Sequence, residues 1–226
     1  MGKALSKVVE LCEGGLRPPF QIQYEEERHQ YFMAPPGIVN PEVWISVPSV
    51  TQVNEQLLNF DGRRDPGTAL QRGTLIHKAC ELIVLGVLDW STVDASILPE
   101  VETFAAWWKE SRFKPLLVES IVGSWRYRFA GRLDIFGIWK TGLALIDFKT
   151  GNEYPAYRFQ TAGLEIALIE TIGLSQYHKS IMLPIQRYCL YLKGDKARPV
   201  QHEDPRDRNV FLAAHTCSHT RRELYP

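Results

Sequence analysis

Apolar and polar residues alternate along four short segments in the middle of the chain. These segments are LLVESIV (116–122), WRYRF (125–129), RLDIFGIW (132–139) and LALIDFK (143–149). Alternation with a period of two is typical of β-strands that bury at least one face. Because only a few residues separate one segment from the next, the pattern predicts an antiparallel meander.

Helices are predicted on both sides of this meander. Ser49 with Gln52 three positions later is a capping-box pattern for a helix ending near Leu58, and Pro99 suits the first position of another helix. The predicted helices are 4–13, 49–58, 68–85, 99–113, 156–172 and a C-terminal stretch from about 205; 20–32 is a predicted strand or hairpin, 180–192 a strand and 61–67 a loop. This order predicts a mixed α/β sandwich with a central sheet.

Composition narrows the functional classes only slightly. The 226 residues include 26 basic and 26 acidic side chains, so a nucleic-acid-binding surface would have to be a local groove. The four cysteines form no C-x-x-C pair, which argues against a zinc ribbon and favours free thiols in a reducing cytoplasm. No apolar run approaches the ~20 residues of a membrane span. We therefore expect a cytoplasmic protein without a membrane segment.

The helix predicted over 68–85 carries a polar stripe. At 100° per residue, Gly73, His77 and Glu81 lie along one narrow stripe, whereas Leu75, Ala79 and Leu82 lie on the opposite side and are expected to face the core. Gly73 would leave room above the stripe for a ligand or another backbone. A solvated His–Glu pair would give the same pattern, so the stripe alone does not decide between a site and a surface.

Two carboxylates and a lysine interrupt the apolar strands of the meander. Leu145, Asp147 and Lys149 share one face of their strand, and Asp134 lies at a similar distance from the turn between the last two strands. Two neighbouring carboxylates repel each other unless a cation lies between them, and Mg²⁺ or Mn²⁺ prefers such oxygen ligands. Lys149 would then stabilise charge that develops on a phosphate. A structural Asp147–Lys149 ion pair is the simpler alternative.

Several motifs together resemble a known nuclease family. RGTLIHKACE, LLVES, YRFAGRLDIFG, LIDFKTG and the helix that begins at Phe159-Gln160 are similar, in this order and spacing, to the motifs of the PD-(D/E)xK nuclease superfamily. The RecB-like exonuclease branch, which includes phage members, is the most similar. The resemblance covers roughly 47–192 and implies a central mixed sheet flanked by helices. It implies a nuclease core over 68–226, preceded by an extension over 1–67 whose hairpin and short helix pack on that core.

The resemblance also implies roles for individual residues. Metal ligation falls to His77, Asp134, Asp147 and the backbone carbonyl of Phe148, and catalysis to Lys149, Asp147 and Asp134; supporting or DNA-binding roles fall to Arg72, Glu81, Glu119 and Gln160. The family's tyrosine four positions after the glutamine is Leu164 here, so a substrate contact by that tyrosine is not expected. The cofactor implied is Mg²⁺ or Mn²⁺. An iron–sulfur cluster is not expected, because the family's C-terminal cysteine cluster is missing.

These features predict a divalent-metal-dependent deoxyribonuclease, with an exonuclease preferred, that acts in recombination, repair or phage DNA processing. The expected partner is DNA, with a single-strand-binding or recombination protein as a further candidate. Three alternatives stay open: a structure-specific or restriction-type endonuclease on the same fold, a catalytically silent nucleic-acid-binding protein, and an α/β protein in which D-x-K is only an ion pair. Arg72, Arg126, Arg128 and Arg132 are candidates for a phosphate-binding groove.

Overall fold

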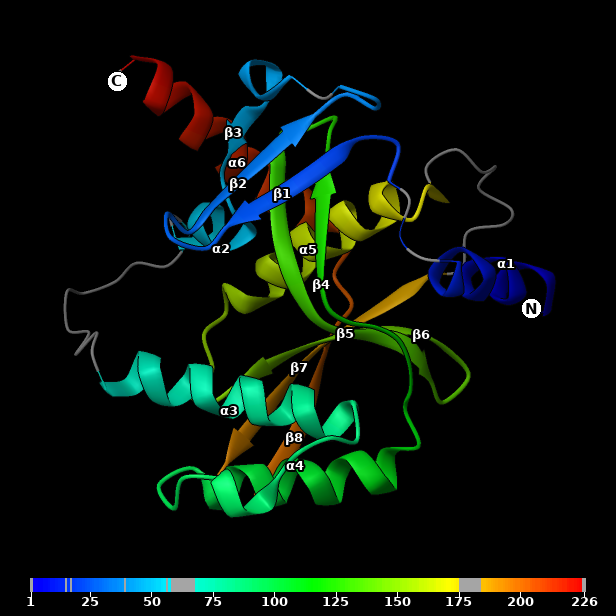
Figure 1. Cartoon of the computed structure of the whole chain (residues 1–226), viewed down its shortest axis with the longest axis vertical. Coiled ribbons are helices and arrows are strands. Elements are labelled where there is room, and N and C mark those ends of the chain that lie inside the picture. Colours follow the sequence, from blue (N-terminus) through cyan, green and yellow to red (C-terminus); the bar gives the residue numbers. More distant parts are fainter. Residues whose placement is uncertain are drawn as a thin grey trace.

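Two β-sheets organise the chain in the computed structural model, which describes residues 2–14, 16, 18–38, 40–55, 57, 68–174 and 184–224 (Figure 1). The larger sheet has the order β4-β5-β6-β7-β8, and all neighbours are antiparallel except β6 and β7. Its strands are β4 (Lys114–Ser124), β5 (Phe129–Trp139), β6 (Gly142–Lys149), β7 (Ile185–Lys193) and β8 (Lys196–His202). The parallel pair follows from the crossover through a helix between β6 and β7.

The smaller sheet is antiparallel and lies against the β4–β5 hairpin. Its strands are β1 (Gln21–Glu25), β2 (Gln30–Ala34) and β3 (Ile45–Val47). Phe20, Met33 and Val47 pack with Ala130 of β5 in a small apolar cluster. A parallel bridge between Ser49 and Ala130 extends the contact.

Helices cover both faces of the larger sheet (Figure 1). They are α1 (Gly2–Glu13), α2 (Val50–Glu55), α3 (Thr68–Val84), α4 (Leu98–Ser111), α5 (Tyr157–Thr171) and α6 (Arg206–Leu224), with 3-10 turns η1 (Pro41–Val43) and η2 (Trp90–Thr92). Apolar side chains of α3 and α4 pack on one face, and those of α1, α2, α5 and α6 pack on the other. None of the helices in the described ranges is both long and apolar enough to cross a membrane.

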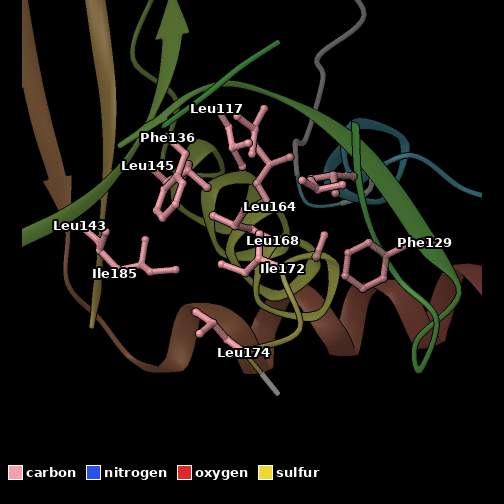
Figure 2. Close-up of a cluster of buried hydrophobic side chains, with 14 of the residues drawn as sticks. Leu117, Phe129, Phe136, Leu143, Leu145, Leu164, Leu168, Ile172, Leu174 and Ile185 are labelled. Atoms are coloured by element: carbon pink, nitrogen blue, oxygen red, sulfur yellow. The ribbon is translucent and has the colours of Figure 1, made fainter. Parts of the chain in front are cut away.

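The side chains of β6 divide between these two cores. Leu143 and Leu145 join the core around α5, where Figure 2 shows them near Leu164 and Leu168. Ala144, Ile146 and Phe148 join the core beneath α3 and α4. The strand is therefore buried on both faces, which explains its nearly continuous apolar sequence. The alternation predicted for this strand is confirmed.

Most predicted elements are present, including the helix that begins after Ser49. Its capping box forms as expected: the Gln52 backbone N–H donates to Ser49 Oγ at 3.0 Å, and the Ser49 backbone N–H donates to Gln52 Oε1 at 2.9 Å. That helix is described only to Glu55, so its predicted end at Leu58 and the predicted loop 61–67 lie outside the described residues, as do 180–183 of the predicted strand. The short strands β3 and β8 were not predicted.

The prediction of a strand over 125–129 was wrong. Residues 125–128 form the turn between β4 and β5, and Arg128 has a φ of 59°. The turn is fixed by Ser124, whose backbone carbonyl accepts a hydrogen bond from the Arg128 N–H at 2.8 Å and whose hydroxyl oxygen accepts one from the Tyr127 N–H at 3.1 Å. Glu170 of α5 also accepts hydrogen bonds from the Ser124 hydroxyl and the Arg126 N–H. These contacts override the strand propensity of the aromatic residues.

Candidate active site

Three carboxylates lie at the same level on three neighbouring strands. Asp134 of β5 lies between Glu119 of β4 and Asp147 of β6. The register follows from the adjacent pairs: Val118↔Ile135 and Ser120↔Leu133 flank Glu119 and Asp134, and Asp147 follows the last pair between β5 and β6, Ile135↔Ile146. On the far side, Asp147 pairs with Cys189 of β7. The sheet thus concentrates acidic groups in its interior, where carboxylates rarely occur unpaired.

The strands β4 and β5 reverse their faces at this level. The core around α5 contains Leu117 and Val122 of β4, which are separated by an odd number of positions. It also contains Leu133 and Phe136 of β5, which are likewise separated by an odd number of positions. Regular alternation would place the members of each pair on opposite faces. Glu119 has a φ of 44°, which is costly for a residue other than glycine. A local irregularity of this kind re-aims side chains, and it brings Glu119 toward Asp134.

His77 of α3 completes a compact group of possible metal ligands. Its Nδ1 lies 3.5 Å from Asp134 Oδ1, and single ligand atoms of His77, Glu119 and Asp134 all lie within 4.8 Å of one another. The imidazole packs edge-on against Phe148, with ring centroids 5.8 Å apart. The Phe148 backbone N–H donates to the Asp134 carboxylate, which anchors that carboxylate to β6. Two carboxylates and one imidazole form a donor set that Mn²⁺ or Mg²⁺ can use.

The protonation of this group reflects its crowding. Burial raises the pKa of Glu119 to about 8, and the negative charge of Asp134 adds to this effect, while His77 opposes it. Burial alone would lower the pKa of His77, but the carboxylate of Asp134 outweighs it and raises the pKa. Burial also opposes ionisation of Asp134, yet His77 and the Phe148 N–H hold the pKa of Asp134 below its ordinary value. The group therefore holds more carboxylates than its single imidazole can neutralise.

Asp147, Lys149 and Gln160 form a second group beside the first. Lys149 Nζ lies 2.5 Å from Asp147 Oδ2 and donates to Gln160 Oε1 at 3.1 Å, and Gln160 Nε2 donates to Asp147 Oδ1 at 3.4 Å. Burial would lower the pKa of Lys149, but the Asp147 carboxylate outweighs burial and raises it, so the ammonium stays charged. Burial raises the pKa of Asp147; Lys149 opposes this shift and Asp134 reinforces it. The two groups thus interact electrostatically.

The compact group of His77, Glu119 and Asp134 differs by one member from the predicted set of side-chain ligands. The predicted ligands were His77, Asp134 and Asp147; the close group instead contains Glu119, to which the resemblance gave only a supporting role, and Asp147 is ion-paired with Lys149. The position of Gln160 next to Asp147 and Lys149 agrees with its predicted place beside the site. Ligation by the Phe148 carbonyl stays a prediction. Counting the register from a correctly placed turn at 125–128 would have identified Glu119 as the partner of Asp134.

Two further predicted residues lie on α3 outside both groups. Arg72 pairs with Glu100 of α4 at 2.7 Å and donates to the Ser96 carbonyl at 3.1 Å. Glu81 pairs with Lys78 at 2.6 Å, and its charge contributes to the raised pKa of Glu119. Arg72 thus links α3 to α4 in this structure, and its predicted contact with DNA stays a prediction.

The orientation predicted for α3 was partly wrong. Leu75 was expected to face the core but is 52% exposed, whereas Ile76, Ala79 and Cys80 pack against the sheet. The buried stripe lies next to the His77 stripe and not opposite it, because a side chain aimed at a site in the sheet must lie near the packed face of its helix. Gly73 lies close to the end of β6: a Cβ atom there would come within 3.2 Å of Thr150 Oγ1. A side-chain hydroxyl thus approaches α3 at Gly73, and the room for a ligand or another backbone expected there stays a prediction.

Comparison with known proteins gives no family assignment. No family model and no curated protein matches the chain. Among solved structures, "Crystal structure of SSO0001" aligns with a TM-score of 0.36 and 11% sequence identity, over 76% of this chain and 83% of that chain.

Proposed function

We propose that the protein is a divalent-metal-dependent deoxyribonuclease of the PD-(D/E)xK type, related to the RecB-like exonucleases, that hydrolyses DNA phosphodiester bonds from strand ends. The observation that carries the proposal is the alignment of Glu119, Asp134 and Asp147 across three neighbouring strands, with His77 above them and Lys149 beside them. Recombination, repair or phage DNA processing would use such an activity, with DNA as the partner and a single-strand-binding or recombination protein as a further one.

The residues present fit a hard divalent cation. Burial and the charge of Asp134 raise the pKa of Glu119 to about 8, because the group has too little positive charge to stabilise a second carboxylate. A bound cation would supply that charge. His77, Glu119 and Asp134 would hold Mg²⁺ or Mn²⁺, and Asp147 and the Phe148 carbonyl would join them as the motif resemblance implies. When bound, such a cation polarises a phosphoryl oxygen and lowers the pKa of a water molecule.

The residues of the chain itself supply the remaining chemistry. Lys149 is charged, and its side chain is 14% exposed, so its ammonium can donate a hydrogen bond to a phosphate oxygen and stabilise the charge that develops there. Gln160 accepts from the ammonium and donates to Asp147, which holds Lys149 beside the carboxylates. Prior positioning of this kind reduces the reorganisation that the reaction requires.

Features outside the D-x-K motif favour this function over a structural ion pair. An ion pair between Asp147 and Lys149 satisfies those two residues but leaves Glu119, Asp134 and His77 unexplained. Elsewhere in the described residues, buried charges are matched differently: Arg187 contacts Asp207 at 3.0 Å and Glu165 at 3.4 Å, so each carboxylate has a guanidinium partner. A strained Glu119 facing a second carboxylate is costly unless a ligand compensates for it.

A cleavage assay tests the proposal. Linear single-stranded, linear duplex and circular DNA, with the linear forms end-labelled, would be incubated with Mg²⁺, with Mn²⁺ or with a chelator. An exonuclease degrades the linear forms alone, and only with a cation; cleavage of circles would indicate an endonuclease. Asp134→Asn should abolish cleavage, while Glu102→Gln, at an exposed carboxylate of α4, should not. DNA binding without cleavage under every condition would favour a silent binding protein and contradict the proposal.

A further inference from the structure

A row of tyrosines leads from Lys149 to the protein surface. Tyr157, the first residue of α5, lies with its ring centroid 4.5 Å from Lys149 Nζ. Tyr154 packs against Tyr157 with ring centroids 5.5 Å apart and an interplanar angle of 86°. Tyr154 is 41% exposed, whereas Tyr157 is half-buried. None of these tyrosines occupies the position of the family's tyrosine, which is Leu164 here.

The position of Tyr154 is fixed by its surroundings. Its backbone carbonyl accepts a hydrogen bond from the Tyr157 N–H at 3.0 Å, which ties it to the start of α5. Pro155 follows it and restricts its backbone to extended conformations. On the inner side, Tyr157 packs on Tyr191, which pairs with Lys149 in the sheet. A tyrosine fixed in this way presents a rigid aromatic surface at little conformational cost.

The surroundings of this surface suit a nucleotide. A Cβ atom at Gly151 would meet nothing within 4 Å, so the loop between Lys149 and Tyr154 has open space beside it. Lys149 lies against the Tyr157 ring and is ion-paired with Asp147. Arg198 lies 5.5 Å from the Tyr191 ring and contacts Glu153. An exposed aromatic ring in a cluster that also contains basic side chains is a combination with which proteins bind unpaired bases and the phosphates between them.

We propose that Tyr154 forms a nucleobase-binding subsite, on which an unpaired base stacks while a neighbouring phosphate of the same single strand lies at Lys149. The subsite rests on the proposed function, since Lys149 is assigned there to the phosphate. It adds the substrate class: a base inside a duplex already stacks on neighbours through both faces, so a base that stacks on Tyr154 comes from single-stranded DNA or a frayed end. Tyr154 positions the substrate and takes no part in the chemical step.

Binding measurements with the full chain test the subsite without depending on cleavage. Fluorescence anisotropy of a short labelled single-stranded DNA would be measured in a chelator. Tyr154→Ala should weaken binding about 5- to 100-fold, the range for loss of one stacked base. Tyr154→Phe should recover the lost affinity, because the ring and not the hydroxyl group stacks. Trp90→Ala serves as the matched control, since Trp90 is 48% exposed on η2.

A DNA strand with abasic residues distinguishes stacking from other effects. Wild-type protein should bind the abasic strand as weakly as Tyr154→Ala binds the normal strand, and the variant should show no further loss. The subsite would be overturned if Tyr154→Ala weakened binding of the normal and the abasic strand equally, or if it weakened binding of neither strand. In the cleavage assay, Tyr154→Ala should raise KM with little change in kcat. If binding depends on the bases but no cation-dependent cleavage occurs, the subsite is supported and the proposed nuclease activity is rejected. If cleavage occurs but binding does not depend on the bases, the nuclease activity is supported and the subsite is rejected.

Discussion

Glu119 and Asp134 lie opposite each other on β4 and β5, and Glu119 adopts a left-handed backbone conformation there. Burial and the charge of Asp134 raise the pKa of Glu119 from 4.5 to about 8. Between these two values the unfolded chain has released the proton and the folded chain retains it. Stability contributed by this group is complete below pH 4.5 and is lost as the pH rises through about 8.

Metal-free protein should therefore lose stability as the pH rises across this window, and Glu119→Gln should make the loss smaller. The remaining slope would come from groups such as His77 and Asp147, whose raised pKa values act in the same direction. Urea unfolding in a chelator at several pH values measures the slope. An identical pH dependence in the wild type and Glu119→Gln would show that Glu119 titrates normally and is not part of a crowded group.

Divalent cations should stabilise the folded protein. A ligand that binds only the folded state adds about 2.7 kcal/mol when its concentration is a hundredfold above its Kd. Mn²⁺ or Mg²⁺ should raise the melting temperature, and more so near pH 8 than at acidic pH, because Glu119 must release its proton to bind a cation. Calorimetric melts with and without each cation provide the measurement.

The same melts identify the ligands. Glu119→Gln and Asp134→Asn should each reduce the cation-dependent shift, whereas Glu102→Gln, at an exposed position on α4, should keep it. Loss of the shift in Asp147→Asn with retention in Glu119→Gln would instead favour the ligand set expected from the motif resemblance.

The sequence predicts the regular parts of this site and misses the irregular ones. The alternation of β6 is unbroken, so the common face of Asp147 and Lys149 could be deduced, and the helix after the capping box at Ser49 was also correct. The reversal at Glu119 and Asp134 depends on a positive φ that no residue type signals there. The misplaced strand at 125–129 concealed that β4 and β5 pair along their whole lengths.

The helix α3 shows a second limit of periodicity. Leu75 and Ile76 are neighbouring apolar residues whose side chains point about 100° apart. Apolar residues thus occur on more than one side of this helix, and periodicity alone does not decide which side is buried. Packing against the sheet buries Ile76 and leaves Leu75 exposed. The contact between His77 Nδ1 and Asp134 Oδ1 at 3.5 Å accompanies this orientation of the helix.

DNA binding should weaken as the salt concentration rises, since the chain has no net charge and must rely on local cations. Arg132 is exposed on β5, and its charge lowers the pKa of Glu119, so it lies close to the metal group. Arg132→Ala should weaken binding similarly for all sequences and reduce the salt slope by about one ion. Arg126→Ala, on the turn between β4 and β5, is the comparison. Filter binding across several salt concentrations would show whether the two variants differ; equal slopes would exclude a specific phosphate contact at Arg132.

Lys149 decides between catalysis and structure. If its ammonium acts on the phosphate, Lys149→Met should lower the cleavage rate per folded molecule by about 100-fold or more while the cation-dependent rise in melting temperature remains. If the Asp147–Lys149 contact is only a structural ion pair, its loss costs roughly 3–5 kcal/mol and activity falls only in proportion to unfolding. Arg187→Met provides the matched control, because Arg187 is 5% exposed and pairs with Asp207 of α6 and Glu165 of α5, outside both groups of the candidate site. That variant should be strongly destabilised yet retain its specific rate where it remains folded. Melting curves and single-turnover rates on the same preparations separate the two cases, and a Lys149→Met variant that behaves like Arg187→Met would refute the catalytic role.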